Sequence, residues 1–205
     1  MKKYWKAFLV TIAVSFLLTG CMGKVKYPAY YKLSLAPPVD PPAKTDAPAS
    51  IAVREFRAPA YLREGPIVYL TSPEAMGFYE YHRWAVDPRQ TITQAIVEHL
   101  RASGNFKLVK IYDGRNDVDY VLSGRLEKLN EVDYEGGVQV EVALSAQVTD
   151  LHSGNTVWVN SAAEKSKVDG RNLSSVVAQM SSLADRSIEE LLKSLALPRL
   201  TTEKQ

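Results

Sequence analysis

The sequence predicts an α+β fold, in which a mostly antiparallel sheet carries two main helices packed on one face. Residues 138–149 alternate between apolar and polar side chains, as an antiparallel strand with one solvated face does. Residues 87–104 and 172–197 repeat apolar side chains at three- and four-residue steps, as amphipathic helices do. Since strands lie before and after the first helix and the second helix comes last, the economical arrangement places both helices on one side of the sheet.

Residues 1–20 have the organisation of a secretory signal peptide. Lys2, Lys3 and Lys6 give a positive start, and residues 7–18 form a run without ionisable side chains. A transmembrane helix is the alternative, but these twelve residues are too few, because a spanning helix needs ~20 to cross a core of ~30 Å. We therefore expect the segment to direct export.

The segment Leu18-Thr19-Gly20-Cys21 resembles the lipobox of bacterial lipoproteins. The resemblance implies that Cys21 is lipidated, becomes the first residue after cleavage and anchors the protein. Two or more acyl chains hold a protein firmly, because each buried methylene contributes ~0.8 kcal/mol. Met22 stands where lipoproteins retained in the inner membrane tend to have aspartate, so the resemblance implies the periplasmic face of the outer membrane. Residues 21–28 would form a lipidated tether.

The charge of the chain does not indicate a nucleic-acid partner. The whole sequence has a net charge of +2, but loss of residues 1–20 removes three lysines and no acid, which leaves the mature chain near −1. No basic strip for nucleic acid or for anionic lipid stands out. Cys21 is the single cysteine, so the mature protein is expected to have no disulfide and to depend on an apolar core.

Residues 29–197 are expected to form one α/β domain. Its first part, 29–35, suits a strand because apolar and polar residues roughly alternate, although an aromatic linker would have a similar composition. Five prolines make 36–50 an extended, exposed crossover, for which a proline-rich partner motif is the alternative. Residues 51–56 and 67–70 are predicted to be strands.

Residues 78–84 alternate in a way that places neighbouring side chains on opposite faces of a strand. One face would carry Phe78, Glu80 and His82, and the other would carry Tyr79, Tyr81 and Arg83. Aromatic residues and arginine are enriched at binding hot spots. The predicted partner-binding surface therefore consists of Tyr79, Tyr81, Arg83 and Trp84. In the alternative interpretation, Trp84 is buried at the start of the first helix and Arg83 braces it.

The two helices have recognisable ends. Asp87 can cap the first helix, Pro88 is tolerated at its first position, and Gly104 stands where glycine is favoured after a helix. Pro198 is expected to end the second helix, and residues 198–205 would form a C-terminal tail.

The remaining strands lie between the helices. Residues 106–109 are predicted to return along the sheet, and 120–126 alternate again with Gly124 as a candidate bulge. A turn at 150–155 would join the long strand to a hairpin partner at 156–159.

No catalytic or metal-binding constellation stands out in the sequence. It contains no Gly-x-Ser-x-Gly nucleophile motif, no phosphate-binding loop and no His-Glu-x-x-His zinc motif. Glu80 and His82, two residues apart in a predicted strand, would supply half of a metal site, but no further pair of ligands accompanies them. We therefore expect no catalytic residue, no metal, no cofactor and no enzymatic activity.

Several short motifs occur in an order that resembles the ABC-type transport auxiliary lipoproteins, the group that includes the PqiC-like lipoproteins. After the lipobox come Tyr30-Tyr31-x-Leu33, the proline-rich stretch, Tyr61-Leu62 before Ile67-Val68-Tyr69, and Tyr81-x-Arg83-Trp84-Ala85-x-x-Pro88. The resemblance covers roughly residues 30–197, and the block around Arg83 is its most specific part.

This resemblance implies an accessory, non-enzymatic subunit of a lipid transport system in the bacterial envelope. Its partners would be a Mce-domain protein that bridges the periplasm and an ABC transporter permease complex in the inner membrane. The lipoprotein would be the docking end at the outer membrane. The family also implies a small α/β domain like the N-terminal domain of TolB. Ring assembly has been associated with the group, so a homo-oligomer is a further expectation.

Two other functions stay open on the sequence alone. A lipoprotein that activates a cell-wall synthase or supports an export channel would use a similar α/β scaffold, although no long spare segment is available for a pore hairpin. A periplasmic hydrolase is the third hypothesis, and activity on a panel of ester or glycan substrates would support it.

The lipobox generates a direct test. Cys21→Ser is expected to abolish incorporation of a labelled fatty acid and to remove the protein from the outer-membrane fraction, because serine lacks the acylated sulfur. Fractionation of cells producing each form, with Met22→Ala as the matched control, measures both effects. A fully acylated Cys21→Ser protein in the outer membrane would contradict the anchor.

Overall fold

The fold is organised around β6 (Tyr120–Val132), the longest strand. The computed structural model describes residues 26–38, 47, 49–134, 136–170 and 172–195, which contain one eight-stranded sheet. The other elements are, in chain order, β1 (Ala29–Tyr31), β2 (Ser50–Val53), η1 (Ala60–Leu62), β3 (Pro66–Leu70), β4 (Met76–Trp84), α2 (Pro88–Ser103), β5 (Leu108–Ile111), β7 (Gln139–Asp150), β8 (Thr156–Lys167) and α3 (Leu173–Lys193).

Strands β6, β7 and β8 form a long antiparallel unit. β7 pairs with β6 from Gln139 to Asp150, and β8 pairs with β7 along almost all of its length. The predicted alternation is confirmed, because the core-facing row of this segment is buried, namely Val138, Val140, Val142, Leu144, Ala146 and Val148. β8 is longer than predicted and runs to Lys167. The prediction stopped short because the second half of β8 has no apolar row that would reveal a strand in the sequence.

The opposite edge of β6 is divided between two strands. β2 pairs parallel with the start of β6, where Ile51 faces Tyr120, and β3 pairs parallel with its end, where Leu70 faces Val132. β5 extends the sheet beyond β2, and β4 and β1 extend it beyond β3. The antiparallel pairs are much longer than the parallel ones, so the predicted mostly antiparallel sheet is confirmed.

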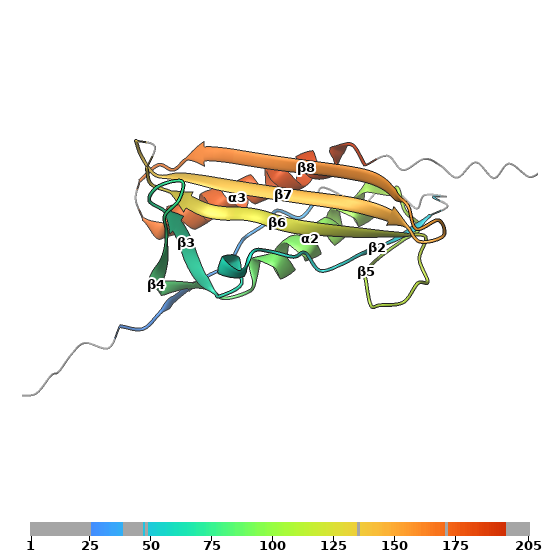
Figure 1. Ribbon diagram of the computed structural model, residues 1–205, viewed down its shortest axis with the longest axis horizontal. Coiled ribbons are helices and arrows are strands. Elements are labelled where there is room, and N and C mark those ends of the chain that lie inside the picture. Colours follow the sequence, from blue (N-terminus) through green and yellow to red (C-terminus); the bar gives the residue numbers. More distant parts are fainter. Residues whose placement is uncertain (1–25, 39–46, 48, 135, 171, 196–205) are drawn as a thin grey trace, which may run out of the picture.

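Figure 1 shows α2 and α3 on one face of the sheet, which confirms the predicted α+β arrangement. The ends of α2 also agree with the sequence. Asp87 Oδ1 accepts a hydrogen bond from the Arg89 N–H at 2.9 Å, and Pro88 occupies the first position. Gly104 ends α2 with φ 66°, a conformation that favours glycine.

α3 packs its apolar stripe against β7 and β8. The stripe consists of Val176, Val177, Met180, Leu183, Ala184, Ile188 and Leu191. Asn172 caps the helix by accepting a hydrogen bond from the Ser175 N–H at 2.8 Å. The helix ends at Lys193, earlier than predicted, and Pro198 lies outside the described residues. No helix in the described part of the chain is long and apolar enough to cross a membrane.

An extended strap, residues 32–38, crosses from β1 onto α3. Leu33 is buried, the Ser34 N–H donates to Ser181 Oγ at 3.0 Å, and the Ala36 N–H donates to the Asp185 carboxylate at 3.1 Å. The strand predicted over 29–35 therefore ends at Tyr31, because the backbone beyond it bonds to a helix instead of a strand. Of the predicted crossover, 39–46 and 48 lie outside the described residues.

The predicted division of β4 into two faces is wrong, because its pairing with β3 shifts register. Val68 pairs with Phe78, whereas Pro66, two residues earlier, pairs with Arg83, five residues further along β4. An odd shift of this kind inverts the alternation of side chains beyond it. Tyr79 and His82 would lie on opposite faces if the alternation were strict. Their rings are instead in edge-to-face contact, with centroids 5.7 Å apart.

Gly124 is not a bulge. It pairs in regular register with Ala146, and the irregularity between β6 and β7 lies further on, between Leu126 and Lys128. The fully buried ring of Phe56 fills the space above Gly124, so that a Cβ there would clash with the ring. Glycine is required at this position because an aromatic side chain covers the backbone.

Asp119 ties the start of β6 to the start of β2. Its Oδ2 accepts hydrogen bonds from Ser50 N–H at 2.7 Å and Ser50 Oγ at 2.6 Å, and its Oδ1 lies 3.2 Å from His152 Nε2. Burial alone would raise the pKa of Asp119, but the hydrogen bonds from Ser50 and His152, together with the charge of Lys107, lower it to about 2. The carboxylate is therefore a stabilising group at neutral pH.

The contact between Phe56 and Gly124 predicts a steric effect. Gly124→Ala is expected to lower the free energy of unfolding by about 1–3 kcal/mol, because the added methyl group displaces a buried ring. Urea denaturation of the purified mature protein measures the change, with Ser123→Ala, the neighbouring residue on the other face, as the control. Equal stability of the Gly124→Ala protein and the control would contradict this packing.

The lowered pKa of Asp119 predicts a dependence on pH. Since the pKa is about 3.9 in an unfolded chain and lower in the folded one, the group stabilises the fold above pH ~4, by about 2 kcal/mol, and this contribution is lost as the pH falls towards 2. The difference in unfolding free energy between wild type and Asp119→Asn is expected to shrink accordingly. Urea denaturation at a series of pH values tests this, and a constant difference would count against it.

Candidate functional site

The predicted partner-binding residues lie where β1, β4 and β3 meet the end of β6. Tyr79 does not face solvent there, because its Oη donates a hydrogen bond to Glu131 Oε2 at 2.9 Å, and Glu131 is buried. Burial raises the pKa of Tyr79 far above its ordinary value, and the hydrogen bond and negative charge of Glu131 raise it further. The phenol of Tyr79 therefore stays protonated at neutral pH and donates the hydrogen bond that joins β4 to β6.

His82 lies between two tyrosines. Its Nδ1 is 3.0 Å from Tyr31 Oη, and its ring centroid lies 5.6 Å from that of Tyr31 and 5.7 Å from that of Tyr79. These contacts give His82 a packing role between β1 and β4. Glu80, its proposed companion in half of a metal site, is exposed. Among the described residues, no group of three or more His, Cys, Asp or Glu side chains is arranged to hold a metal ion.

Trp84 is 7% exposed and belongs to the core. Its backbone N–H donates to Gly65 O at 2.8 Å, and its partner in β1 is Tyr31. The structure therefore places Trp84 beneath the predicted surface, as in the alternative interpretation of the sequence. Tyr79 and Trp84 therefore fix β4 to the core beneath the two remaining residues, Tyr81 and Arg83.

Tyr81 and Arg83 are the predicted residues that remain at the surface. Arg83 Nη2 donates to Glu64 O at 3.1 Å, and the guanidinium lies close to Gly65, whose φ is 93°. This bond gives the long side chain a preferred position. Lys26 Nζ lies 5.5 Å from the centre of the Tyr81 ring, a distance typical of a cation–π contact.

One further tyrosine belongs to this surface. Tyr30 pairs with Arg83 across the β1–β4 ladder and is 63% exposed. We call the group of Tyr30, Tyr81 and Arg83 the β1–β4 surface. Tyr30 is absent from the surface predicted from the sequence, because only the parallel pairing of β1 with β4 brings residues some fifty positions apart together. The lipidation residue, Cys21, lies outside the described residues.

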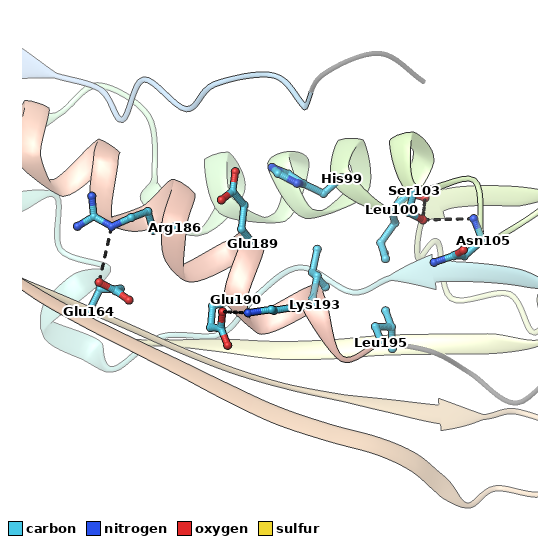
Figure 2. Close-up of a pocket in the computed structure, with 11 residues that line it drawn as sticks. His99, Leu100, Ser103, Asn105, Glu164, Arg186, Glu189, Glu190, Lys193 and Leu195 are labelled. Carbon is cyan, nitrogen blue, oxygen red and sulfur yellow. Dashed lines mark hydrogen bonds and ion pairs between the residues drawn. The ribbon is translucent and has the colours of Figure 1, made fainter. Parts of the chain in front are cut away.

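A cleft of about 530 Å³ lies between α2, α3 and β8 (Figure 2). This volume suits a small molecule, but such sites are usually lined by apolar groups. Here the walls carry ion pairs, with Arg186 Nε 3.7 Å from Glu164 and Lys193 Nζ 3.2 Å from Glu190. These four charged side chains are therefore paired with one another along the walls of the cleft.

Neither the histidine nor the serine of this cleft belongs to a nucleophile–base pair. His99 Nε2 is buried and has no hydrogen-bond partner within the described residues. Ser103 Oγ donates to Leu100 O at 2.8 Å, the carbonyl of the preceding helical turn. A serine nucleophile needs a base within hydrogen-bond reach, so the cleft does not present this constellation.

The fold resembles that of several solved structures. A protein of Xanthomonas campestris from the family described as DUF330 aligns with a TM-score of 0.69 and 16% identity, over 80% of this chain and 92% of its own. An uncharacterised protein aligns with a TM-score of 0.63 and 15% identity, over 83% and 99%. A PelC dodecamer from Paraburkholderia phytofirmans aligns with a TM-score of 0.43 and 20% identity, over 72% of this chain and 92% of its own.

The sequence comparisons place the chain in a family. No curated protein matches it. The model of the family described as ABC-type transport auxiliary lipoprotein component matches residues 31–191, which include every helix and strand from the end of β1 to most of α3. The protein therefore belongs to the ABC-type transport auxiliary lipoprotein components.

Proposed function

We propose that the protein is a non-enzymatic docking subunit of a lipid transport system of the Mce and ABC type. In this proposal Cys21 carries acyl chains that hold the protein on the periplasmic face of the outer membrane. The β1–β4 surface binds the Mce-domain protein, which connects the lipoprotein to the permease complex in the inner membrane. The observation that carries the proposal is a preformed aromatic and cationic surface directly beside the tether.

The position of this surface follows from the length of the tether. Only five residue steps separate Cys21 from Lys26, which already contacts Tyr81. A fully extended chain spans at most ~3.5 Å for each residue, so the surface would lie within roughly 20 Å of the lipidated residue. A protein held by such an anchor presents the β1–β4 surface close to the membrane.

The chemistry of the surface suits a protein partner. Tyrosine and arginine are enriched at interface hot spots, because they combine a large apolar area with a hydrogen-bonding end. Arg83 is oriented by Glu64 O before any partner arrives, which reduces the entropy that binding must overcome. The rigid base of Tyr79 and Trp84 keeps β4 in place beneath Tyr81.

The absence of catalysis is the second part of the proposal. The acids of the cleft between α2 and α3 include Glu164 and Glu190, and both pair with a basic side chain. Asp119, the carboxylate with the lowered pKa of about 2, is bound by Ser50 and His152, so its role is structural. Binding is therefore the activity that the described chemistry supports best.

Substitutions on the β1–β4 surface test the docking function. Tyr81→Ala and Arg83→Ala are each expected to reduce recovery of the Mce-domain protein about tenfold, because hot-spot truncations cost ~1.4 kcal/mol or more. The measurement is quantitative co-purification from native membranes. Arg125→Ala is the matched control, since Arg125 is an exposed arginine on β6, outside this surface.

Two outcomes of the co-purification experiment would contradict the docking proposal. Recovery that is unchanged in Tyr81→Ala and Arg83→Ala would exclude the β1–β4 surface as the docking site. Failure of the wild-type protein to retain any Mce-domain protein would contradict the proposed function as a whole.

A further inference from the structure

A groove crosses the face of the sheet opposite to α2 and α3, which cover the other face (Figure 1). Its volume is about 520 Å³, and it is bounded by β6, β7, β8 and the segment 54–57 that follows β2. We call it the outer groove. The side chains that bear on a ligand there are those of Arg54, Arg57, Arg125, Ser145, Gln147 and Val159.

The pairing of the strands sets these side chains in two rows. In one row Arg57 lies beside Arg125, and Arg125 pairs with Ser145. In the next row Gln147 pairs with Val159. Paired residues on neighbouring strands point to the same face of a sheet. The outer groove therefore has basic side chains at one end, hydroxyl and amide groups in the middle and an apolar side chain at the other end.

The opposition of Arg57 and Arg125 is unfavourable for the fold by itself. Neighbouring strands lie only ~4.8 Å apart, and like charges on directly opposed residues destabilise a sheet. Arg125 Nε donates to Glu127 Oε2 at 2.8 Å, which offsets one charge. Arg57 is exposed and forms no ion pair or side-chain hydrogen bond with another described residue. Glu55, the acid that lines the groove, is paired with Arg89 at 3.7 Å. An anion between the two arginines would offset the remaining charge.

The basic end of the groove is held in place before any ligand arrives. Arg54 Cζ lies 4.6 Å from the centre of the Tyr112 ring, in a cation–π contact. Glu127 accepts hydrogen bonds from Arg125 Nε and, at 2.7 Å, from Ser145 Oγ, so it orients both groups. Because the bond from Arg125 uses Nε, its Nη groups are available to a ligand. The planar fork of arginine matches the oxygen atoms of a phosphate group.

The apolar end of the groove restricts the class of ligand. Val159 is 69% exposed, and residues 156–163 around it on β8 contain no charged residue. A ligand that covers both ends must therefore combine an anionic group with an apolar part. A phospholipid has this combination in its phosphate and its acyl chains, whereas inorganic phosphate would leave Val159 uncovered.

We propose that the outer groove binds an anionic phospholipid, with the phosphate between Arg57 and Arg125 and the acyl chains beside Val159. A volume of about 520 Å³ accommodates the headgroup and leaves most of the acyl chains outside. Ser145 and Gln147 supply hydrogen bonds to the oxygen atoms near the phosphate. This inference rests on the proposed function, because a lipid transport system brings phospholipid to the protein. It adds a lipid contact separate from the β1–β4 surface.

Photocrosslinking in intact cells tests the inference. The full-length protein carries the photoreactive residue benzoylphenylalanine in place of Val159, and the cells are grown with radioactive phosphate. Irradiation is expected to label the protein, because the reactive ketone touches the lipid. The label is expected on the proteolytic peptide that contains position 159, and alkali is expected to release fatty acid from that peptide. The control places the same residue at Gln94, exposed on α2, where about tenfold less label is expected.

An arginine variant tests the role of the basic end. Arg57→Gln, in the protein with the photoreactive residue, is expected to reduce labelling about tenfold, because it removes the guanidinium fork that faces the phosphate. Arg115→Gln is the matched control, since Arg115 is an exposed arginine in the loop after β5, outside the groove. Equal labelling of the two variants would overturn the proposal.

The outcomes identify the ligand. A labelled peptide that carries fatty acid supports a phospholipid. An adduct with another protein, or a labelled peptide without fatty acid, overturns the proposal. Free phosphate has no C–H bond with which the ketone can react, so a groove that takes only this ion gives no adduct, and that result also overturns the proposal.

The same cells separate this inference from the docking function. Tyr81→Ala is expected to lose the Mce-domain protein and to keep the lipid adduct, whereas Arg125→Ala is expected to keep the Mce-domain protein and to lose the adduct. If the wild-type protein retains the Mce-domain protein and gives no adduct, the lipid site is wrong and the docking function stands.

A stability measurement distinguishes a ligand-binding Arg57 from a structural one. Arg57→Gln removes the opposition of like charges, so its urea midpoint is expected to equal or exceed that of the wild type. The measurement uses the full-length protein in a neutral detergent, with Arg115→Gln as the control. A midpoint of Arg57→Gln below those of the wild type and the control would overturn the proposal.

Discussion

The backbone groups of β6 need hydrogen-bond partners along both of its edges, and the other strands are arranged to supply them. β7 occupies one edge completely, whereas β2 and β3 hold only the two ends of the other. The gap between them is filled by the chain that follows β2. There, Arg54 N–H bonds to Leu122 O at 2.8 Å and Arg57 N–H bonds to Gly124 O at 3.0 Å. This path carries Phe56 over Gly124, so the glycine and the aromatic ring complete the sheet together.

Each end of β6 is fastened by one polar group. Asp119 holds the start through Ser50, and Glu131 holds the end through Tyr79. Both fastenings join segments that are distant in the chain, and both place a carboxylate where hydrogen bonds offset the cost of burial. The β1–β4 surface, which includes Tyr81, lies next to the hydrogen bond between Tyr79 and Glu131. The position of this surface therefore depends on the contact that joins β4 to β6, which explains how a strand of only three residues, β1, can be part of it.

The elements with a local signal could be predicted from the sequence. The two helices, the cap at Asp87, the glycine at 104 and the row of β7 depend on residues close together in the chain, so periodicity reveals them. The length of β8 could not be predicted, because neighbouring β7 and not its own composition stabilises its second half. The faces of β4 were misassigned, because the shift opposite Pro66 is a property of two strands. The strap ended the first strand early, because Ser181 and Asp185 take its N–H groups.

For the candidate site, residue types were predictable and directions were not. Tyr81 and Arg83 are at the surface, whereas Tyr79 and Trp84, within two residues of them in sequence, face the core. A strand pattern with a strict period of two cannot distinguish these pairs once a bulge intervenes. Tyr30 joins the site only through parallel pairing with β4, and long-range pairing of that kind has no local signature.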